Sequence, residues 1–137
     1  MHIQNALNLL ENQMDFIGVS GVEDKLQSNV QQTIDSLKGA GIQVWMLTGD
    51  RVETGTSIAI SAGLKSKQNE LYFITEHVNP SEISLKLTDF RKRVKKTILI
   101  IDGKTLDTIF ESEELIFQFF DVAMLAPCLC VCRCSPT

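Results

Sequence analysis

The sequence lacks the features that would assign it to a bilayer, an export pathway or a nucleic acid. No apolar run approaches the roughly 20 residues of a membrane-spanning helix. Residues 1–15 do not show the basic and then apolar order of a signal peptide. Lysine and arginine number 13 against 17 aspartates and glutamates, a net charge of −4, which argues against a nucleic-acid partner. We therefore expect this piece of chain itself to be soluble.

Cysteine is absent until residue 128, and four then follow at 128, 130, 132 and 134. They are too crowded to staple a secreted scaffold, so a reducing compartment is expected. On a strand, this spacing places all four on one face. Structural zinc sites use cysteine pairs on turns with partners further away, and neighbours on one strand cannot surround a metal. We interpret them as buried structural thiols, with a metal or redox role as the alternative.

The 137 residues have an ordinary globular composition, 44% hydrophobic and 22% charged, without repeats or low-complexity tracts. Apolar periodicity predicts helices alternating with short strands. Residues 42–47 are apolar at five of six positions, as in a strand covered on both faces. The expected helices are 3–14, 25–39, 52–62, 80–94, 104–110 and 113–123, and the expected strands are 16–19, 42–47, 71–75, 97–101 and 129–132. This alternation predicts an α/β fold with an open, mostly parallel sheet.

The turn Thr48-Gly49-Asp50 joins the strand 42–47 to the helix that follows it. In open α/β sheets, ligands bind outside the carboxyl ends of the strands. A helix N-terminus offers free N–H groups that suit a phosphate, Thr48 adds a hydroxyl, and Gly49 lets an anion approach the backbone. These residues predict a phosphoryl-binding turn. A helix cap without a ligand is the alternative, since Thr and Asp both cap helices well.

Two further residues are expected at the same edge of the sheet. Asp24 stands between the strand 16–19 and the next helix, and Arg133 follows the last strand. Asp24 would add an acidic residue to this rim, and two acidic residues there can position a ribose, an arginine or a metal. Arg133 can pair with a phosphate or with an aspartate. The plainer alternatives are a helix cap for Asp24 and a surface residue in a turn for Arg133.

The other polar features give weaker signals. Arg91-Lys92-Arg93 and Lys95-Lys96 lie near the C-terminus of a predicted helix, where cations are favourable. A solvated helix end is expected there, and a weak contact with anionic lipid or with another domain is the alternative. Asp102-Gly103 is interpreted as a turn, and Met14 and Trp45 as core residues.

Four ordered motifs form a combination that is more specific than any one of them. They are Gly21-Val22-Glu23-Asp24-Lys25-Leu26-Gln27, Gly39-Ala40-Gly41-Ile42, Trp45-Met46-Leu47-Thr48-Gly49-Asp50-Arg51-Val52-Glu53-Thr54 and Cys132-Arg133-Cys134-Ser135-Pro136-Thr137. Over about residues 7–137, the chain resembles the phosphorylation domain of the P-type ATPases, and most closely the phospholipid flippase class. The third and fourth motifs are most similar to the branch thought to work without an accessory subunit.

The resemblance implies a partial Rossmann-like fold of the haloacid dehalogenase superfamily. It implies an enzyme that uses ATP and Mg²⁺ to phosphorylate an aspartate, hydrolyses the phosphoaspartate, and moves phospholipid to the cytoplasmic leaflet. By the same resemblance, Thr48, Gly49 and Asp50 hold nucleotide and phosphoryl group, Arg133 contacts the nucleotide, and Asp24 supports the same rim. The parent would be an integral membrane protein of an endomembrane or the plasma membrane, with this domain on the cytoplasmic face.

The chain also departs from the family pattern. It has no Asp-Lys-Thr-Gly-Thr run, which carries the nucleophile, and no Gly-Asp-Gly-x-Asn-Asp metal motif. We therefore expect residues 1–137 to be one partial phosphorylation domain excised from a larger multi-domain membrane protein, without catalytic residues or metal ligands of its own and inactive alone. The phospholipid would bind membrane helices that lie outside this chain. Without the nucleophile strand, the sheet is expected to expose an edge on which a second chain can pair.

Other functions stay open at this point. A stand-alone phosphatase of the same superfamily, a cation-pumping relative, and a non-catalytic module that binds a nucleotide or a partner through Thr48-Gly49-Asp50 all share this turn. A stand-alone phosphatase would need an Asp-x-Asp nucleophile, which this chain lacks.

Overall fold

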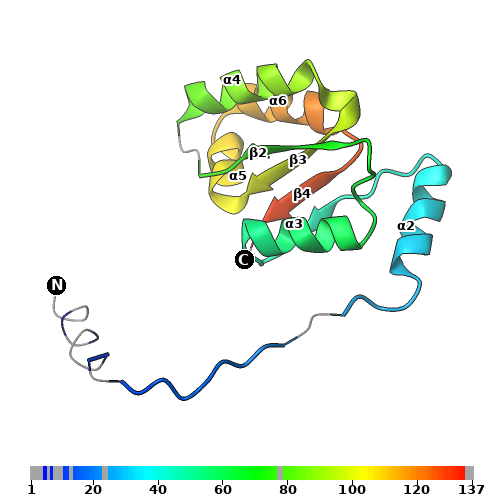
Figure 1. Cartoon of the computed structure of the whole chain (residues 1–137). Coiled ribbons are helices and arrows are strands. Elements are labelled where there is room, and N and C mark those ends of the chain that lie inside the picture. Colours follow the sequence, from blue (N-terminus) through cyan, green and yellow to red (C-terminus); the bar gives the residue numbers. More distant parts are fainter. Residues whose placement is uncertain are drawn as a thin grey trace.

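Helices and short parallel strands alternate along the chain (Figure 1). The computed structural model describes residues 5, 7, 11, 12, 14–22, 25–76 and 79–134. The helices are α2 (Val30–Gly39), α3 (Val52–Ser61), α4 (Pro80–Arg91), the 3-10 helix η1 (Val94–Lys96), α5 (Gly103–Phe110) and α6 (Glu113–Ala123). The strands are β1 (Met46–Leu47), β2 (Glu70–Ile74), β3 (Thr97–Asp102) and β4 (Leu129–Cys132).

The four strands form one open sheet in the order β1-β4-β3-β2, and every pairing is parallel. β2 pairs with β3 from Glu70 opposite Thr97 to Ile74 opposite Ile101. β1 adds only two pairs, Met46 with Cys130 and Leu47 with Val131. Parallel pairing brings all carboxyl ends to one edge, as the predicted site requires. The architecture confirms the α/β prediction and is consistent with a partial Rossmann-like fold.

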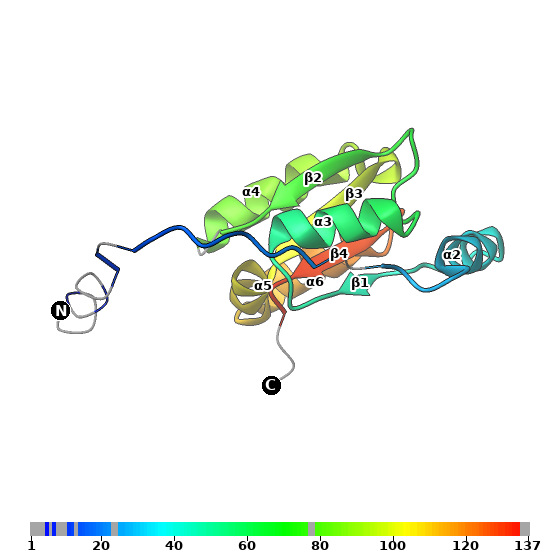
Figure 2. The ribbon, with the colours of Figure 1, turned by 60° about the horizontal axis from the view of Figure 1, so that its bottom comes forward.

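Helices cover both faces of the sheet, which explains why its central strands are apolar throughout. Leu99 and Ile101 of β3 are buried beneath α4, α5 and α6, whereas Ile98 and Ile100 are buried on the α3 side. Figure 2 shows α3 on one side of the sheet and α4 with α6 on the other, while α2 stands apart from the sheet, beyond the C-terminal end of α3. The two layers hold the sheet, and therefore its carboxyl edge, in place.

The helices with clear sequence signals begin where they were predicted. Asn79 accepts a hydrogen bond from the N–H of Ser81 at 3.0 Å, Pro80 follows it, and α4 begins there. Ser112 caps α6 in the same way. A capping side chain satisfies one of the N–H groups that a helix start leaves free. α5 begins at Gly103, one residue before the predicted start.

Three predictions for the N-terminal part are wrong. Residues 16–19 form no strand, and Ile17 is fully exposed, because no described strand lies beside this segment. Met14 is 70% exposed and is not a core residue. The helix predicted from Lys25 begins only at Val30, after Asn29 with its φ of +69°. In the helix predicted at 3–14, the described residues 5 and 7 are helical, and much of the rest lies outside the described residues.

The strand predicted at 42–47 shrinks to Met46–Leu47. β1 is an outermost strand with only β4 as a neighbour, so the chain before Met46 has no partner that would extend the ladder. The apolar pattern of 42–47 had predicted cover on both faces, yet Leu47 is 64% exposed. The prediction of an open sheet edge therefore holds at β1, within the part of the chain that the structure describes.

Candidate functional site

The loops after β1 and β4 are joined by backbone hydrogen bonds at the carboxyl edge of the sheet. The N–H of Arg133 donates to the carbonyl of Asp50 at 2.9 Å, and the N–H of Cys134 donates to the carbonyl of Thr48 at 3.0 Å. The N–H of Thr48 donates to the carbonyl of Val131 and continues the β1–β4 ladder. The structure thus brings together Thr48-Gly49-Asp50 and Arg133, which lie more than 80 residues apart in the sequence. We call these four residues, with the start of α3, the rim.

The turn itself is closed by its own side chains. The Thr48 hydroxyl donates to Oδ2 of Asp50 at 3.0 Å and accepts a hydrogen bond from the Asp50 N–H at 3.1 Å. Neither residue caps α3, whose N-cap position is Arg51 and has no side-chain cap. Among the described residues, no side chain accepts a hydrogen bond from the first turn of α3. The helix-cap alternative is therefore not what the structure has, and the N–H groups at this helix start are free to bind an anion.

Two glycines of this region differ sharply in their surroundings. A Cβ on Gly49 would have no atom within 4 Å, so the outer side of the turn is open. A Cβ on Gly55, one turn into α3, would lie 2.7 Å from Sγ of Cys132 and 3.1 Å from Cγ2 of Thr48. Glycine at 55 therefore lets α3 lie directly on the sheet, and this contact fixes the start of α3 beside the turn. Gly49, two residues before the N-cap of that helix, lies on the open side of the turn.

Asp102 occupies the centre of the same edge, and the prediction of a simple turn was wrong. Its side chain is the N-cap of α5: Oδ1 accepts from the N–H of Thr105 at 3.0 Å, and Oδ2 accepts from the N–H of Glu76 at 2.8 Å. The residue is only 3% exposed. Burial alone would raise its pKa, but the hydrogen bonds from Thr105 and Glu76 and the charge of Arg133 lower the pKa of Asp102 overall. This carboxylate therefore ties the loop after β2 to the start of α5.

Gly103 supports the Arg133 loop directly. A Cβ at Gly103 would lie 2.5 Å from the carbonyl oxygen of Arg133, so only glycine lets the two backbones approach this closely. Arg133 has a φ of +52° and Glu76 a φ of +62°, a conformation that residues other than glycine seldom adopt. Such backbone conformations often gather at functional sites because the surrounding contacts hold them there. Both residues lie at the carboxyl edge that carries the rim.

The amino-acid sequence is similar to segments of much longer curated proteins. Phospholipid-transporting ATPase NEO1 of Saccharomyces cerevisiae is 39% identical over 127 residues, which cover 93% of this chain and 11% of that protein. Probable phospholipid-transporting ATPase IIB of Homo sapiens is 38% identical over 137 residues, 100% of this chain and 12% of that protein. The chain is homologous to a segment of the phospholipid-transporting ATPases. No family model matches it.

A third relative is phospholipid-transporting ATPase DRS2 of Saccharomyces cerevisiae, at 37% identity over 143 residues, 98% of this chain and 10% of that protein. The segment therefore spans about a tenth of the length of these relatives. In the described ranges, no helix is both long enough and apolar enough to cross a bilayer.

One expected site residue, Asp24, is not among the residues that the structure describes. Its place at the rim therefore stays a prediction. Within the described ranges, no three histidine, cysteine or carboxylate side chains are grouped as metal ligands would be. The described part of the rim combines the uncapped start of α3 and the Arg133 loop with the Asp50 carboxylate.

The cysteines follow the predicted strand geometry with one exception. Cys128, Cys130 and Cys132 are buried on the α3 side of β4, and the sulfurs of Cys130 and Cys132 are 3.7 Å apart. Burial raises the pKa of the Cys128 thiol to about 11, and burial also raises the pKa of Cys132. Cys134 instead packs against the core on the opposite face, because the left-handed backbone of Arg133 ends the strand alternation. The prediction that all four share one face was wrong for Cys134.

Asp102 and Gly103 are the residues of this edge that the sequence interpretation missed. A local signal was available, since Asp102 directly follows a buried strand and stands three residues before Thr105, the spacing of an N-cap. The contact between Gly103 and Arg133 has no such signal, because it depends on β3 and β4 being neighbours.

Proposed function

We propose that this chain is part of the phosphorylation domain of a phospholipid-translocating P-type ATPase and that its rim binds the nucleotide and the transferred phosphoryl group. In the whole enzyme, ATP would supply the phosphoryl group. The domain would lie on the cytoplasmic face of a membrane, and the phospholipid would bind elsewhere in the protein. Residues 1–137 would be one partial domain of that enzyme.

One observation carries the proposal: the start of α3 has no side-chain cap and lies between Thr48-Gly49-Asp50 and the Arg133 loop. Free N–H groups at a helix start attract an anion, and the helix dipole adds a partial positive charge there. The open space at Gly49 lets a phosphate reach the backbone. Arg133 adds a cation that can form two parallel hydrogen bonds with a phosphate.

The residues of this chain would bind and orient the phosphoryl group, not attack it. The Thr48–Asp50 hydrogen bonds hold the turn in one conformation before a ligand arrives. Donors fixed in advance stabilise the charge that develops during phosphoryl transfer without reorganising at that moment. The nucleophilic aspartate would come from another part of the enzyme. We propose that the ligands of Mg²⁺ also come from other parts of the enzyme.

The open edge at β1 offers a position for the strand that would carry the nucleophilic aspartate. Leu47 of β1 is largely exposed. The Trp45 Nε1–H is buried and has no hydrogen-bond partner among the described residues, an unfavourable situation for a polar group. A further parallel strand beside β1 would cover this apolar surface. It would also bring its own carboxyl end next to Thr48.

The proposal is tested by titrating the chain with ATP and following backbone amide resonances by NMR. We expect the amides of Thr48, Gly49 and Val52 to shift. Gly49→Ala should weaken binding at least about tenfold, because the added methyl group would occupy the space through which the phosphate approaches. Gly39→Ala is the matched control, since its Cβ also has no atom within 4 Å but lies at the far end of α2.

Two outcomes would contradict the proposal: a wild-type chain whose rim amides do not respond to ATP, or a Gly49→Ala chain that binds as well as the Gly39→Ala control. In the whole enzyme, Asp50→Asn should strongly reduce the ATP-dependent phosphoenzyme, because the Thr48–Asp50 turn would lose its charged acceptor. An unchanged phosphoenzyme level would remove Asp50 from the site.

A further inference from the structure

The amino ends of β2 and β3, at the opposite end of the strands from the rim, carry an excess of positive charge. The loops 62–69 and 92–96 lead into β2 and β3 at their amino ends. Together they hold six cations and no carboxylate, although the whole chain has a net charge of −4. These six residues, which we call the basic edge, are Lys65, Lys67, Lys92, Arg93, Lys95 and Lys96.

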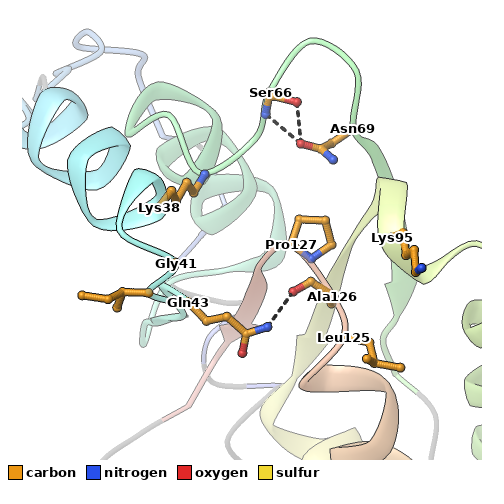
Figure 3. A pocket seen from close by; sticks show the side chains of 10 residues that line it. Lys38, Gly41, Gln43, Ser66, Asn69, Lys95, Leu125, Ala126 and Pro127 are labelled. Carbon is orange, nitrogen blue, oxygen red and sulfur yellow. Dashed lines mark hydrogen bonds between the residues drawn. The ribbon is translucent and has the colours of Figure 1, made fainter.

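The two loops form one surface because their strands are neighbours. Glu70, the first residue of β2, pairs with Thr97, the first residue of β3. Nδ2 of Asn69 donates to the carbonyl of Lys96 at 3.3 Å and joins the loops directly. A hollow of about 450 Å³ opens beside them. Figure 3 shows Lys38 and Lys95 on opposite sides of this hollow.

Little of this charge is neutralised within the molecule. Asp89 pairs with Arg93 at 3.1 Å and with Lys92 at 3.9 Å, and it also accepts a hydrogen bond from the Tyr72 hydroxyl. Among the residues that the structure describes, no carboxylate comes within ion-pair distance of the four remaining lysines, Lys65, Lys67, Lys95 and Lys96. The surface is therefore attractive to an anionic partner.

Apolar side chains border the basic edge. Ile42 and Leu125 line the same hollow and are half-exposed, and Met124 beside them is exposed to a similar degree. Nε2 of Gln43 donates to the carbonyl of Met124 at 2.6 Å and holds these two segments together. Lysines beside exposed aliphatic residues suit the surface of a bilayer, where the ammonium groups meet lipid phosphates and the apolar groups enter the interface. The hollow has no aromatic side chain on which a nucleic-acid base could stack.

We propose that the basic edge docks on the surface of an anionic lipid bilayer. The flexible stems of the lysines let several ammonium groups contact lipid head groups at once, without a shaped pocket. Because the basic edge and the rim lie at opposite ends of the strands, a domain docked in this way would present its rim to the solvent. The inference does not depend on nucleotide binding.

The test is co-sedimentation of the 137-residue chain with vesicles of phosphatidylcholine alone or with 30% phosphatidylserine, at about 0.1 M salt. We expect binding to the anionic vesicles only, and loss of that binding at about 0.5 M salt as the charges are screened. Lys95→Gln with Lys96→Gln should lower the partition coefficient roughly tenfold. The matched control, Arg51→Gln with Lys104→Gln, removes the same charge at the carboxyl ends of the strands, where α3 and α5 begin. Far-ultraviolet circular dichroism establishes that both variants fold.

Several results would overturn the inference. Equal binding to neutral vesicles would assign the affinity to the exposed apolar segment around Ile17. An equal loss in both double variants would assign the binding to net charge and not to this edge. Absence of binding to anionic vesicles would refute it directly, and displacement from the vesicles by a short RNA at equimolar charge would make the edge a general polyanion site. Each result is independent of the ATP titration.

Discussion

Replacing Gly103 by alanine should displace the Arg133 loop. The new Cβ would lie 2.5 Å from the carbonyl oxygen of Arg133, 3.2 Å from its carbonyl carbon and 3.7 Å from Cα of Cys134. These are all backbone atoms, so no side-chain rotation can relieve the contact. Either α5 moves away from β4, or the loop that carries Arg133 moves away from β1.

The expected cost follows from two opposing effects. Forcing an extra methyl group into a close contact costs about 1–3 kcal/mol. Alanine in place of a helical glycine recovers about 0.5–1 kcal/mol. The free energy of unfolding should therefore fall by about 0.5–2 kcal/mol. If the loop moves, the hydrogen bonds from Arg133 and Cys134 to the turn weaken as well, and each is worth about 0.5–1.5 kcal/mol.

Urea unfolding of the 137-residue chain measures this change, with Gly49→Ala as the control. The Gly49 site has no atom within 4 Å, so that variant should stay within about 0.5 kcal/mol of the wild type. A Gly103→Ala chain that is as stable as wild type, with unshifted amide resonances at Arg133, would refute the conclusion that Gly103 supports the loop. A loss of stability with an unmoved loop would place the strain in α5.

Two further predictions concern buried groups. Because the pKa of Asp102 is lowered in the folded state, its contribution to stability is complete above the unfolded pKa of about 3.9 and is lost as the pH falls through the folded pKa. Asp102→Asn should therefore lose less stability than wild type between pH 5 and pH 3 in urea unfolding, and parallel losses would contradict this. Iodoacetamide at pH 8 should modify half-buried Cys134 first and should reach Cys128 only on unfolding. The reason is that burial raises the pKa of the Cys128 thiol and keeps it protonated. Mass spectrometry measures the two labelling rates, and equal rates would contradict this prediction.

Local sequence signals were sufficient to predict where α4 and α6 begin, the two helices that lie on the face of the sheet opposite α3. Asn79 and Pro80 define the start of α4, and Ser112 that of α6, because a cap acts within one turn of the helix that it begins. The central strands could also be predicted, since β3 and β4 are buried on both faces and are apolar at nearly every position. In these segments, local preference and tertiary burial agree.

Segments whose structure depends on a neighbour could not be predicted in this way. Residues 16–19 have a strand composition but no strand beside them in the described structure. Residues 42–47 have a neighbouring strand, β4, on one side only, and within them only Met46 and Leu47 pair with it. β-propensity describes how well a side chain fits a covered, pleated surface, so it predicts a strand only where that surface is supplied. Both segments lie in a chain that spans about a tenth of the phospholipid-transporting ATPases to which it is similar.

The residues of the rim could be predicted from the sequence, whereas the support of the Arg133 loop could not, for a related reason. Thr48-Gly49-Asp50 could be identified because a turn between a strand and a helix carries its chemistry locally. The support from Gly103 could not, because the order β1-β4-β3 that places Arg133 between Asp50 and Gly103 is not written in any local pattern. That order makes β4 the link between the two sides of the edge: Arg133 is hydrogen-bonded to the β1 loop and packed on the β3 loop. A phosphate bound by Arg133 would therefore pull on both loops, so a substitution at Gly103 should weaken nucleotide binding without any contact to the nucleotide.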